Sequence, residues 1–134
     1  MGSVLLDATV LIDFLRGRSD VRDRLLRVRD SGDVAHTCAV AVEETVRGLR
    51  EGEEERARAL FLGLREVPLG TAEGWRAGQW RREFARRGVT LAQGDCLIAA
   101  AALAIGARLA TANVKDFPME GLTVEDWGAD RTTR

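Results

Sequence analysis

The hydrophobic pattern alternates between short apolar runs and longer segments in which apolar residues recur every three or four positions. The short runs are typical of buried strands, and the wider spacing is typical of helices packed on a sheet. We predict strands over residues 3–6, 34–38, 65–69, 108–112 and 122–124, and helices that begin near residues 8, 19, 39, 53, 71 and 95. This alternation predicts an α/β fold around a central, mainly parallel sheet. We expect residues 1–134 to form a single domain, with a disordered tail over about 129–134.

Two of the expected helices carry more specific predictions. Within residues 39–50, we expect a helix whose apolar stripe is Val42, Val46 and Leu49. The helix over residues 71–87 combines aromatic and arginine side chains. We expect its aromatic residues to be core or dimer contacts rather than platforms for bases; they are Trp75, Trp80 and Phe84. Its arginines indicate a solvated face, with phosphate contact as the alternative; they are Arg76, Arg81, Arg82, Arg86 and Arg87.

The segment over residues 94–117 poses an electrostatic question. Asp95 stands at the start of a helix that is otherwise almost entirely apolar as far as Gly106. A helix that is apolar all round belongs in the interior. A carboxylate at its buried end is costly to ionise unless a cation or hydrogen-bond donors compensate it.

Composition excludes several classes of protein. The net charge is −1, so the chain has no broad basic surface for nucleic acid. Cys38 and Cys96 lie in apolar surroundings and are expected to be core residues in a reducing compartment. The sequence has one histidine and no pair of neighbouring cysteines, so it lacks the usual ligands of a zinc site. With no signal-peptide pattern and no apolar run of about 18 residues, we expect a cytoplasmic protein that does not enter a membrane.

Several acids are predicted to meet at one edge of the sheet, because sites in parallel sheets form outside the carboxyl ends of the strands. Carboxylates that lie close together cannot all ionise without a cation, and this sequence does not place a basic residue beside each of them. Ligand sets made only of oxygen atoms suit Mg²⁺ or Mn²⁺. Such an ion, or a pair about 4 Å apart, can activate water and stabilise the charge that develops on a phosphodiester. We therefore predict phosphodiester hydrolysis. The candidate residues are Asp7, Glu43, Glu44, Asp95, Asn113 and Asp116.

Five motifs follow one another along nearly the whole chain. They are LDATVLID (6–13), ETVRG (44–48), DCLIAA (95–100), TANVKDF (111–117) and GLTVEDW (121–127). Each is weak alone, but together and in this order they resemble the PIN-domain ribonucleases and, within them, the VapC-type toxins of bacterial toxin–antitoxin pairs. The resemblance implies a PIN-like, three-layer α/β/α fold and a Mg²⁺-dependent endoribonuclease, with Mn²⁺ as a substitute.

The resemblance also implies roles for individual acids. Asp7 and Asp95 match the first and third acids of the family's site, and Glu44 matches the second because it stands four residues before a glycine. These three would hold the metal. The fourth position falls on Asn113, and Asp116 is the residue that could supply the missing charge. On this comparison Glu43 is a solvated neighbour, and Asp13 is structural.

Three positions depart from the family's pattern. Cys38 and Ala41 stand where small hydroxyl residues are frequent, and Ala8 stands where threonine is frequent. These departures affect hydrogen bonds around the site rather than the acids themselves.

The implied partners are an RNA substrate, cut to leave a 3′-hydroxyl and a 5′-phosphate, and a VapB-like antitoxin that presents a basic side chain to the acids. A homodimer is also implied. Two alternatives stay open: a housekeeping RNA-processing PIN nuclease, and a catalytically silent PIN-like binding module. Intact Asp7, Glu44 and Asp95 count against the silent module, and the short single domain favours the toxin.

Two other carboxylate-centred folds fit poorly. A haloacid-dehalogenase-type phosphotransferase needs a second Asp two residues after the first, and Thr9 occupies that place. A response-regulator receiver needs an acceptor Asp at the end of its middle strand, where residues 67–69 read Val-Pro-Leu.

Overall fold

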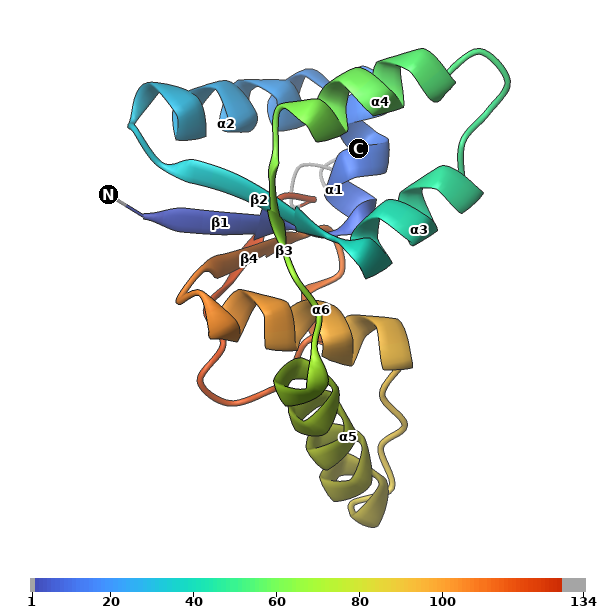
Figure 1. Cartoon of the computed structure of the whole chain (residues 1–134), viewed down its shortest axis with the longest axis vertical. Coiled ribbons are helices and arrows are strands. Elements are labelled where there is room, and N and C mark those ends of the chain that lie inside the picture. The colour runs from blue at the N-terminus through green and yellow to red at the C-terminus, as the bar shows by residue number, and fades with distance from the viewer. Residues whose placement is uncertain (1, 129–134) are drawn as a thin grey trace.

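A computed structural model describes residues 2–128, which form a five-stranded sheet with helices on both faces (Figure 1). The strands are β1 (Ser3–Leu6), β2 (Val34–Cys38), β3 (Arg65–Val67), β4 (Arg108–Thr111) and β5 (Val124–Asp126). Their order is β3-β2-β1-β4-β5, and every neighbouring pair is parallel. The predicted α/β class is therefore confirmed. The predicted tail over 129–134 lies outside the described residues.

Helices cover both faces of the sheet. They are α1 (Ala8–Leu15), α2 (Ser19–Asp30), α3 (Ala39–Arg47), α4 (Glu54–Leu62), α5 (Thr71–Arg86) and α6 (Gln93–Ala104), with a 3₁₀ turn at Val114–Asp116. Figure 1 shows α1, α2 and α4 above the sheet and α6 below it. α5 packs against α6 and extends away from the sheet. Within residues 2–128, no helix is both long and apolar enough to cross a bilayer.

The core forms where β1 and α6 meet. Val4, Leu5 and Leu6 of the central strand are fully buried, as expected for a parallel strand covered on both faces. In α6, Ile98 and the alanines of residues 99–102 are also buried. Small alanine side chains let α6 approach both the sheet and α5 closely, so its first turn is held firmly at the carboxyl edge of the sheet.

The apolar stripe predicted for residues 39–50 is only partly packed against the core, through Leu49. The buried residues of α3 are Ala41 and Thr45, whereas Val46 is 50% exposed. α3 packs against α1, α6 and α4, and it buries its small side chains rather than its valines. The stripe instead lines an apolar groove between α3 and α4, together with Phe61 and Leu62.

Three smaller predictions also need correction. α3 ends at Arg47, three residues early, because Gly48 takes the C-cap position. The last strand is β5 at 124–126 rather than 122–124. Trp80 and Phe84 are buried in the core as predicted, but Trp75 is 70% exposed, so it is not a core residue and its role as a dimer contact stays a prediction.

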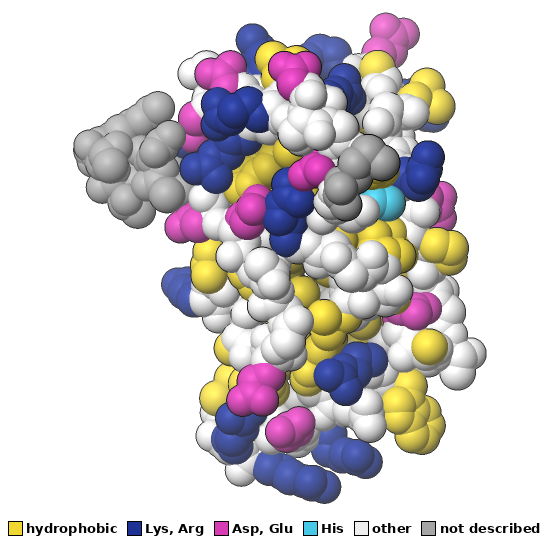
Figure 2. Space-filling view, turned by 90° about the vertical axis from the view of Figure 1, so that its left-hand side faces the viewer, with side chains coloured by type: hydrophobic (Ala, Val, Ile, Leu, Met, Phe, Trp, Pro, Cys, Tyr) yellow, Lys and Arg dark blue, Asp and Glu magenta, His cyan; other side chains and the backbone are white. Residues whose placement is uncertain are grey.

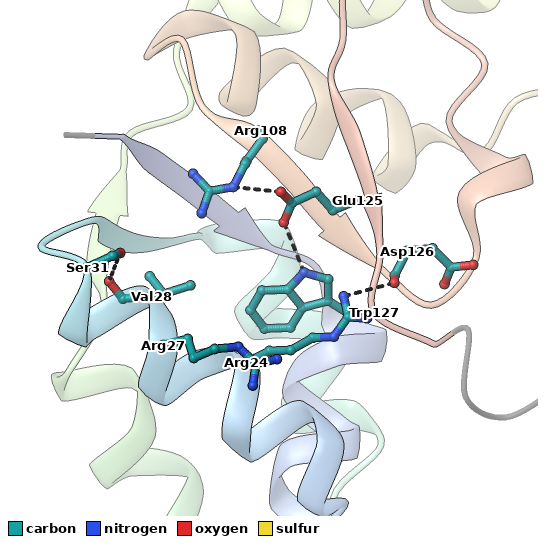
Figure 3. Close-up of a pocket in the computed structure, with 8 residues that line it drawn as sticks. All are labelled: Arg24, Arg27, Val28, Ser31, Arg108, Glu125, Asp126 and Trp127. Carbon is teal, nitrogen blue, oxygen red and sulfur yellow. Dashed lines mark hydrogen bonds and ion pairs between the residues drawn. The ribbon is translucent and has the colours of Figure 1, made fainter.

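A polar network around Trp127 holds β5 in place (Figure 3). The buried indole donates its Nε1–H to Glu125 (3.1 Å), and Arg108 forms an ion pair with the same carboxylate (2.9 Å). From α2, the Arg24 guanidinium lies over the indole ring, 5.9 Å from its centroid, and donates to the backbone oxygen of Asp126 (3.1 Å). These contacts hold the end of β5 against α2 and β4.

Gly128 follows directly and packs against the chain beyond β4. A Cβ at this position would lie 2.7 Å from the Cβ and 2.9 Å from the Cα of Ala112. We expect Gly128→Ala to destabilise the protein by about 1–3 kcal/mol, because the backbone must shift to relieve the overlap. Urea denaturation would measure the loss. Gly78→Ala is the matched control: it meets nothing within 4 Å on α5, so helix propensity should make it neutral or stabilising. Equal effects from both changes would contradict the prediction.

Candidate active site at the carboxyl edge of the sheet

Asp7 is built into the junction between β1 and α1. It is the N-cap of α1, and its Oδ1 accepts hydrogen bonds from the backbone N–H groups of Thr9 (3.0 Å) and Val10 (3.3 Å) and from the Thr9 hydroxyl. Its Oδ2 accepts from the hydroxyl of Thr111 (2.6 Å). Both oxygens are therefore held in place. Asp7 serves as a helix cap and, at the same time, stands at the edge where a site is expected.

The two threonines also fix the loop after β4. The backbone N–H of Ala112 donates to the Thr9 hydroxyl (2.9 Å), and that of Asn113 donates to the Thr111 hydroxyl (3.0 Å). The sequence patterns predict no role for either hydroxyl, although both lie within the motifs. The signal that could have found them is a hydroxyl residue two positions after the strand-end acid and another at the end of the neighbouring strand.

Thr9 and Thr111 supply hydroxyl groups to the site, whereas Cys38 and Ala41 stand where small hydroxyl residues are frequent in the family. Cys38 caps α3 without a side-chain hydrogen bond, and Cys38 and Ala41 are fully buried. The hydroxyl groups that contact Asp7 come instead from Thr9 and Thr111. The prediction that Cys38 and Cys96 are core residues is confirmed, since both are free and buried.

Burial governs the electrostatics of Asp7. Only 4% of the residue is exposed, and desolvation raises the pKa of its carboxyl group above the ordinary value. The hydrogen bonds from Thr111, Thr9 and Val10 oppose this rise without cancelling it. A nearby cation would lower the pKa and stabilise the ionised form.

Glu44 reaches the site from α3 through a gap left by Gly94. A Cβ at residue 94 would lie 2.5 Å from Oε2 of Glu44, so the carboxylate rests against the first turn of α6, next to Asp95. A helix N-terminus favours negative charge. Burial is the main cause that raises the pKa of Glu44; the Arg47 charge lowers it, and the Asp7 charge raises it further.

Asp95 stands in the first turn of α6 and is also strongly perturbed. Its pKa is raised to about 6, first by burial and then by the negative charges of Asp116, Glu44 and Asp7. Each of these three carboxylates is thus close enough to act on Asp95. The structure brings four of the sequence-predicted acids together.

The remaining candidates separate clearly. Glu43 is exposed on the outer side of α3, as expected for a solvated neighbour. Asn113 is exposed and joins the network through its backbone N–H, whereas Asp116 is half-buried and repels Asp95. This contrast favours Asp116 over Asn113 as the fourth acidic member. Asp13 is buried within α1.

The donor set fits a hard divalent cation. Within residues 2–128, Asp7, Glu44, Asp95 and Asp116 form no ion pair with an arginine or lysine. In the same part of the chain, no three acidic, histidine or cysteine side chains are close enough together to enclose an ion as they stand. Carboxylates that raise one another's pKa repel, and a cation would remove that repulsion. Oxygen-only donors suit Mg²⁺ or Mn²⁺ rather than zinc.

A substitution at Gly94 should alter the geometry of the site without lowering the stability of the fold. Gly94→Ala should displace the Glu44 carboxylate, because the side-chain end can rotate away from the new Cβ. Alanine is the better helix former by up to about 1 kcal/mol, so thermal stability should be unchanged or raised. We expect activity to fall about tenfold or more. Gly74→Ala on α5, where nothing lies within 4 Å, is the control; unchanged activity in Gly94→Ala would contradict the prediction.

Comparison with known proteins identifies the family and the fold. Residues 4–118 match the family model described as PIN domain. The chain is 36% identical over 116 residues to "Ribonuclease VapC10" of Mycobacterium tuberculosis, covering 87% of this chain and 86% of that protein. It is 28% identical over 115 residues to "Ribonuclease VapC19" of the same organism, covering 86% and 92%. The structure of VapBC2 from Rickettsia felis, bound to a DNA fragment from its promoter, superposes with a TM-score of 0.81 at 20% identity, covering 93% of this chain and 98% of that one.

Proposed function

Because this chain belongs to the PIN-domain family and, within it, to the VapC-type ribonucleases, we propose that it is the endoribonuclease toxin of a toxin–antitoxin pair. The observation that carries the proposal is the acidic cluster of Asp7, Glu44, Asp95 and Asp116, delivered from four different elements to one edge of the sheet. A cluster of acids without a histidine or serine nucleophile is suited to metal-dependent hydrolysis of a phosphodiester.

PIN-domain VapC ribonucleases depend on divalent metals, and we propose Mg²⁺ for this chain, with Mn²⁺ as a substitute. Asp7, Glu44 and Asp95 would hold the ion, with Asp116 beside Asp95. Bound there, Mg²⁺ would polarise water and offset the charge that develops on the phosphate. The protein's own contribution is positional. Thr9 and Thr111 hold both oxygens of Asp7, and Gly94 lets the Glu44 carboxylate lie against α6.

The two alternatives are less well supported. A silent binding module does not require four acids to be kept together at a cost in burial and repulsion. A housekeeping nuclease would use the same site, but the relatives that match over most of their length are VapC ribonucleases.

The purified protein tests the proposal directly. With Mg²⁺ it should cleave RNA to products with 5′-phosphate and 3′-hydroxyl ends, and chelation should stop the reaction. Asp7→Asn should abolish cleavage and any growth arrest on expression while circular dichroism shows an intact fold. Glu43→Gln removes the same charge from an exposed position on α3 and should keep full activity. Wild-type cleavage by Asp7→Asn would refute the site.

We further propose that the antitoxin docks in the apolar groove between α3 and α4. Val46 is 50% and Leu62 is 88% exposed. The other lining residues are Val42, Leu49, Ala57 and Phe61, with Glu54 and Arg58 from α4. Exposed apolar grooves commonly receive an amphipathic helix of a partner. We propose a homodimer on the ground of family membership.

Charge placed in this groove should separate partner binding from catalysis. Val46→Asp with Leu62→Asp should weaken antitoxin binding at least tenfold in a calorimetric titration, since apolar contact is replaced by buried charge. RNA cleavage should persist, because neither residue belongs to the acidic cluster. Leu26→Asp, on the outer side of α2 and 51% exposed, is the matched control. Undiminished antitoxin binding by the double variant would place the partner elsewhere.

A further inference from the structure

A second charged feature lies on α5, away from the acids. A cleft of about 640 Å³ opens between α5 and the loop that follows the 3₁₀ turn. Figure 2 shows basic side chains gathered at the lower end of the molecule, the end formed by α5 in Figure 1. The basic residues that line this cleft, which we call the arginine groove, are Arg76, Arg82, Arg86 and Arg87.

These arginines are free to bind an anion. In residues 2–128 none of the four forms an ion pair, whereas Arg16, Arg18, Arg58 and Arg108 each pair with a carboxylate. Glu83 and Glu120 also line the groove, so arginine exceeds acid there by two: 4 − 2 = 2. The groove is thus a local positive surface on a chain whose net charge is −1.

Two of the guanidinium groups are positioned by aromatic rings. Arg76 lies over Trp80, 4.9 Å from the ring centroid, and Arg87 lies over Phe84 at 4.1 Å. Both rings belong to buried residues. A stacked guanidinium keeps its N–H edge available, so these contacts orient donors toward a ligand without using them.

One face of α5 adds an exposed aromatic side chain. Trp75, Gln79, Arg82 and Arg86 follow one another at helical spacing and lie on the same face, over a rise of about 16 Å. Gln79, Arg82 and Arg86 line the groove, and Trp75 at the other end of the face is 70% exposed. A basic track combined with an exposed ring is the usual surface for single-stranded nucleic acid.

One end of the arginine groove lies close to the acidic cluster along the chain. Asp116 contributes to the cluster, and Pro118, two residues later, lines the groove. Two residues span at most roughly 7 Å of chain. The acids themselves repel phosphate, so a polyanionic substrate needs attraction from a neighbouring surface.

We propose that the arginine groove binds backbone phosphates of the single-stranded RNA substrate beyond the scissile bond, and that Trp75 stacks on one of its bases. This inference rests on the proposed ribonuclease function. It assigns to α5 the phosphate contacts that sequence patterns leave as an alternative, and it replaces the expected core or dimer role of Trp75.

The binding test uses the full chain with a chelator present, so that RNA is bound but not cut. A fluorescently labelled single-stranded RNA is titrated at several salt concentrations. Arg82→Gln with Arg86→Gln should weaken binding about tenfold. Loss of two phosphate contacts should also reduce the slope of log K against log salt by about 1.4. Trp75→Ala should weaken binding about tenfold, and Trp75→Phe should retain most of it.

Controls and a catalytic readout make the result decisive. Arg22→Gln with Arg29→Gln removes the same charge from exposed positions on α2, across the sheet, and should leave binding unchanged. With Mg²⁺, the groove variant should raise KM for long RNA, keep kcat, and cleave a dinucleotide as the wild type does.

Wild-type RNA affinity in the groove variant, or an equal loss in the α2 control, would overturn the proposal. So would light scattering that shows the groove variant to be monomeric where the wild type is dimeric, because the surface would then contact a second copy. Failure of the wild type to cut any RNA would refute the proposed function instead.

Discussion

Asp95→Asn should abolish RNA cleavage and, in the same protein, raise the thermal stability of the metal-free form at pH 8. Catalysis should fall by at least a thousandfold, because the change removes a charge from the centre of the acidic cluster. Stability should rise because the folded wild type carries Asp95 ionised at this pH, although burial and the charges of Asp116, Glu44 and Asp7 all oppose ionisation. The asparagine has no such charge to bury.

The magnitude follows from the pKa of Asp95, which rises from 3.8 to about 6. A shift of this size corresponds to at most about 3 kcal/mol, and solvent screening reduces it, so we expect a gain of about 1–2 kcal/mol. For a domain of this length the gain amounts to several degrees in Tm. Loss of a negative charge from the first turn of α6 subtracts a few tenths of a kcal/mol.

The sign can be checked by varying the pH. A carboxyl group whose pKa is higher in the folded than in the unfolded protein stabilises the fold when protonated. The contribution of Asp95 to the stability of the wild type should therefore rise as the pH falls through about 6, and fall as the pH rises again. His36 acts in the opposite direction: burial and the Arg65 charge lower its pKa, so its contribution is lost on acidification. Because both proteins contain His36, its contribution cancels in the difference between their unfolding curves, which reports Asp95 together with its repulsion from Asp116, Glu44 and Asp7.

Two further comparisons complete this experiment. Glu43→Gln, the exposed neighbour, should change neither activity nor stability. Adding Mg²⁺ should raise the Tm of the wild type at pH 8 and have much less effect on Asp95→Asn, since a ligand that binds only the folded state stabilises it. A variant less stable than the wild type at pH 8 without metal would show that Asp95 is compensated by something other than a cation.

The sequence alone shows that residues 94–117 bury an acid, because the acid and the apolar helix that carries it belong to the same short segment. An apolar helix with one acid in its first turn must bury that acid, whatever surrounds it. The parallel sheet was equally predictable, since short apolar runs that alternate with helices have few other arrangements. The convergence of Asp7, Glu44 and Asp95 could also be predicted, because each follows or adjoins the carboxyl end of a strand.

Long-range packing explains what could not be predicted. Periodicity identifies the apolar stripe of α3 but not which neighbour covers it, and Val46 borders an open groove. The same limit applies to Trp75, which is apolar by type but lies beyond the reach of α6. Thr9 and Thr111 meet across 102 residues of sequence through the pairing of β1 with β4, and no local pattern records that contact.

Thr111→Val should weaken divalent-metal binding by about 10–100-fold without removing any acid. Thr111 is fully buried, and its hydroxyl donates to Oδ2 of Asp7 (2.6 Å) while it accepts from the backbone N–H of Asn113 (3.0 Å). Valine has nearly the same shape but supplies neither bond. Asp7 would lose the donor that most opposes the effect of burial, so its pKa should rise further. Partners of this kind typically influence metal affinity to the stated extent.

Stability should fall as well, by about 1–3 kcal/mol, because a buried carboxylate oxygen of Asp7 and the part-buried N–H of Asn113 lose their partner. Thr45→Val is a closely matched control: Thr45 is also fully buried, but its hydroxyl bonds only to the carbonyl of Ala41 within α3 (2.7 Å). That carbonyl already accepts a backbone hydrogen bond within the helix, so Thr45→Val should change the free energy of unfolding very little. Isothermal titration with Mn²⁺ and urea denaturation would measure both effects. If Thr111→Val bound metal as tightly as Thr45→Val, the hydroxyl would be structural, and Asp7 would owe its position to the cap of α1 alone.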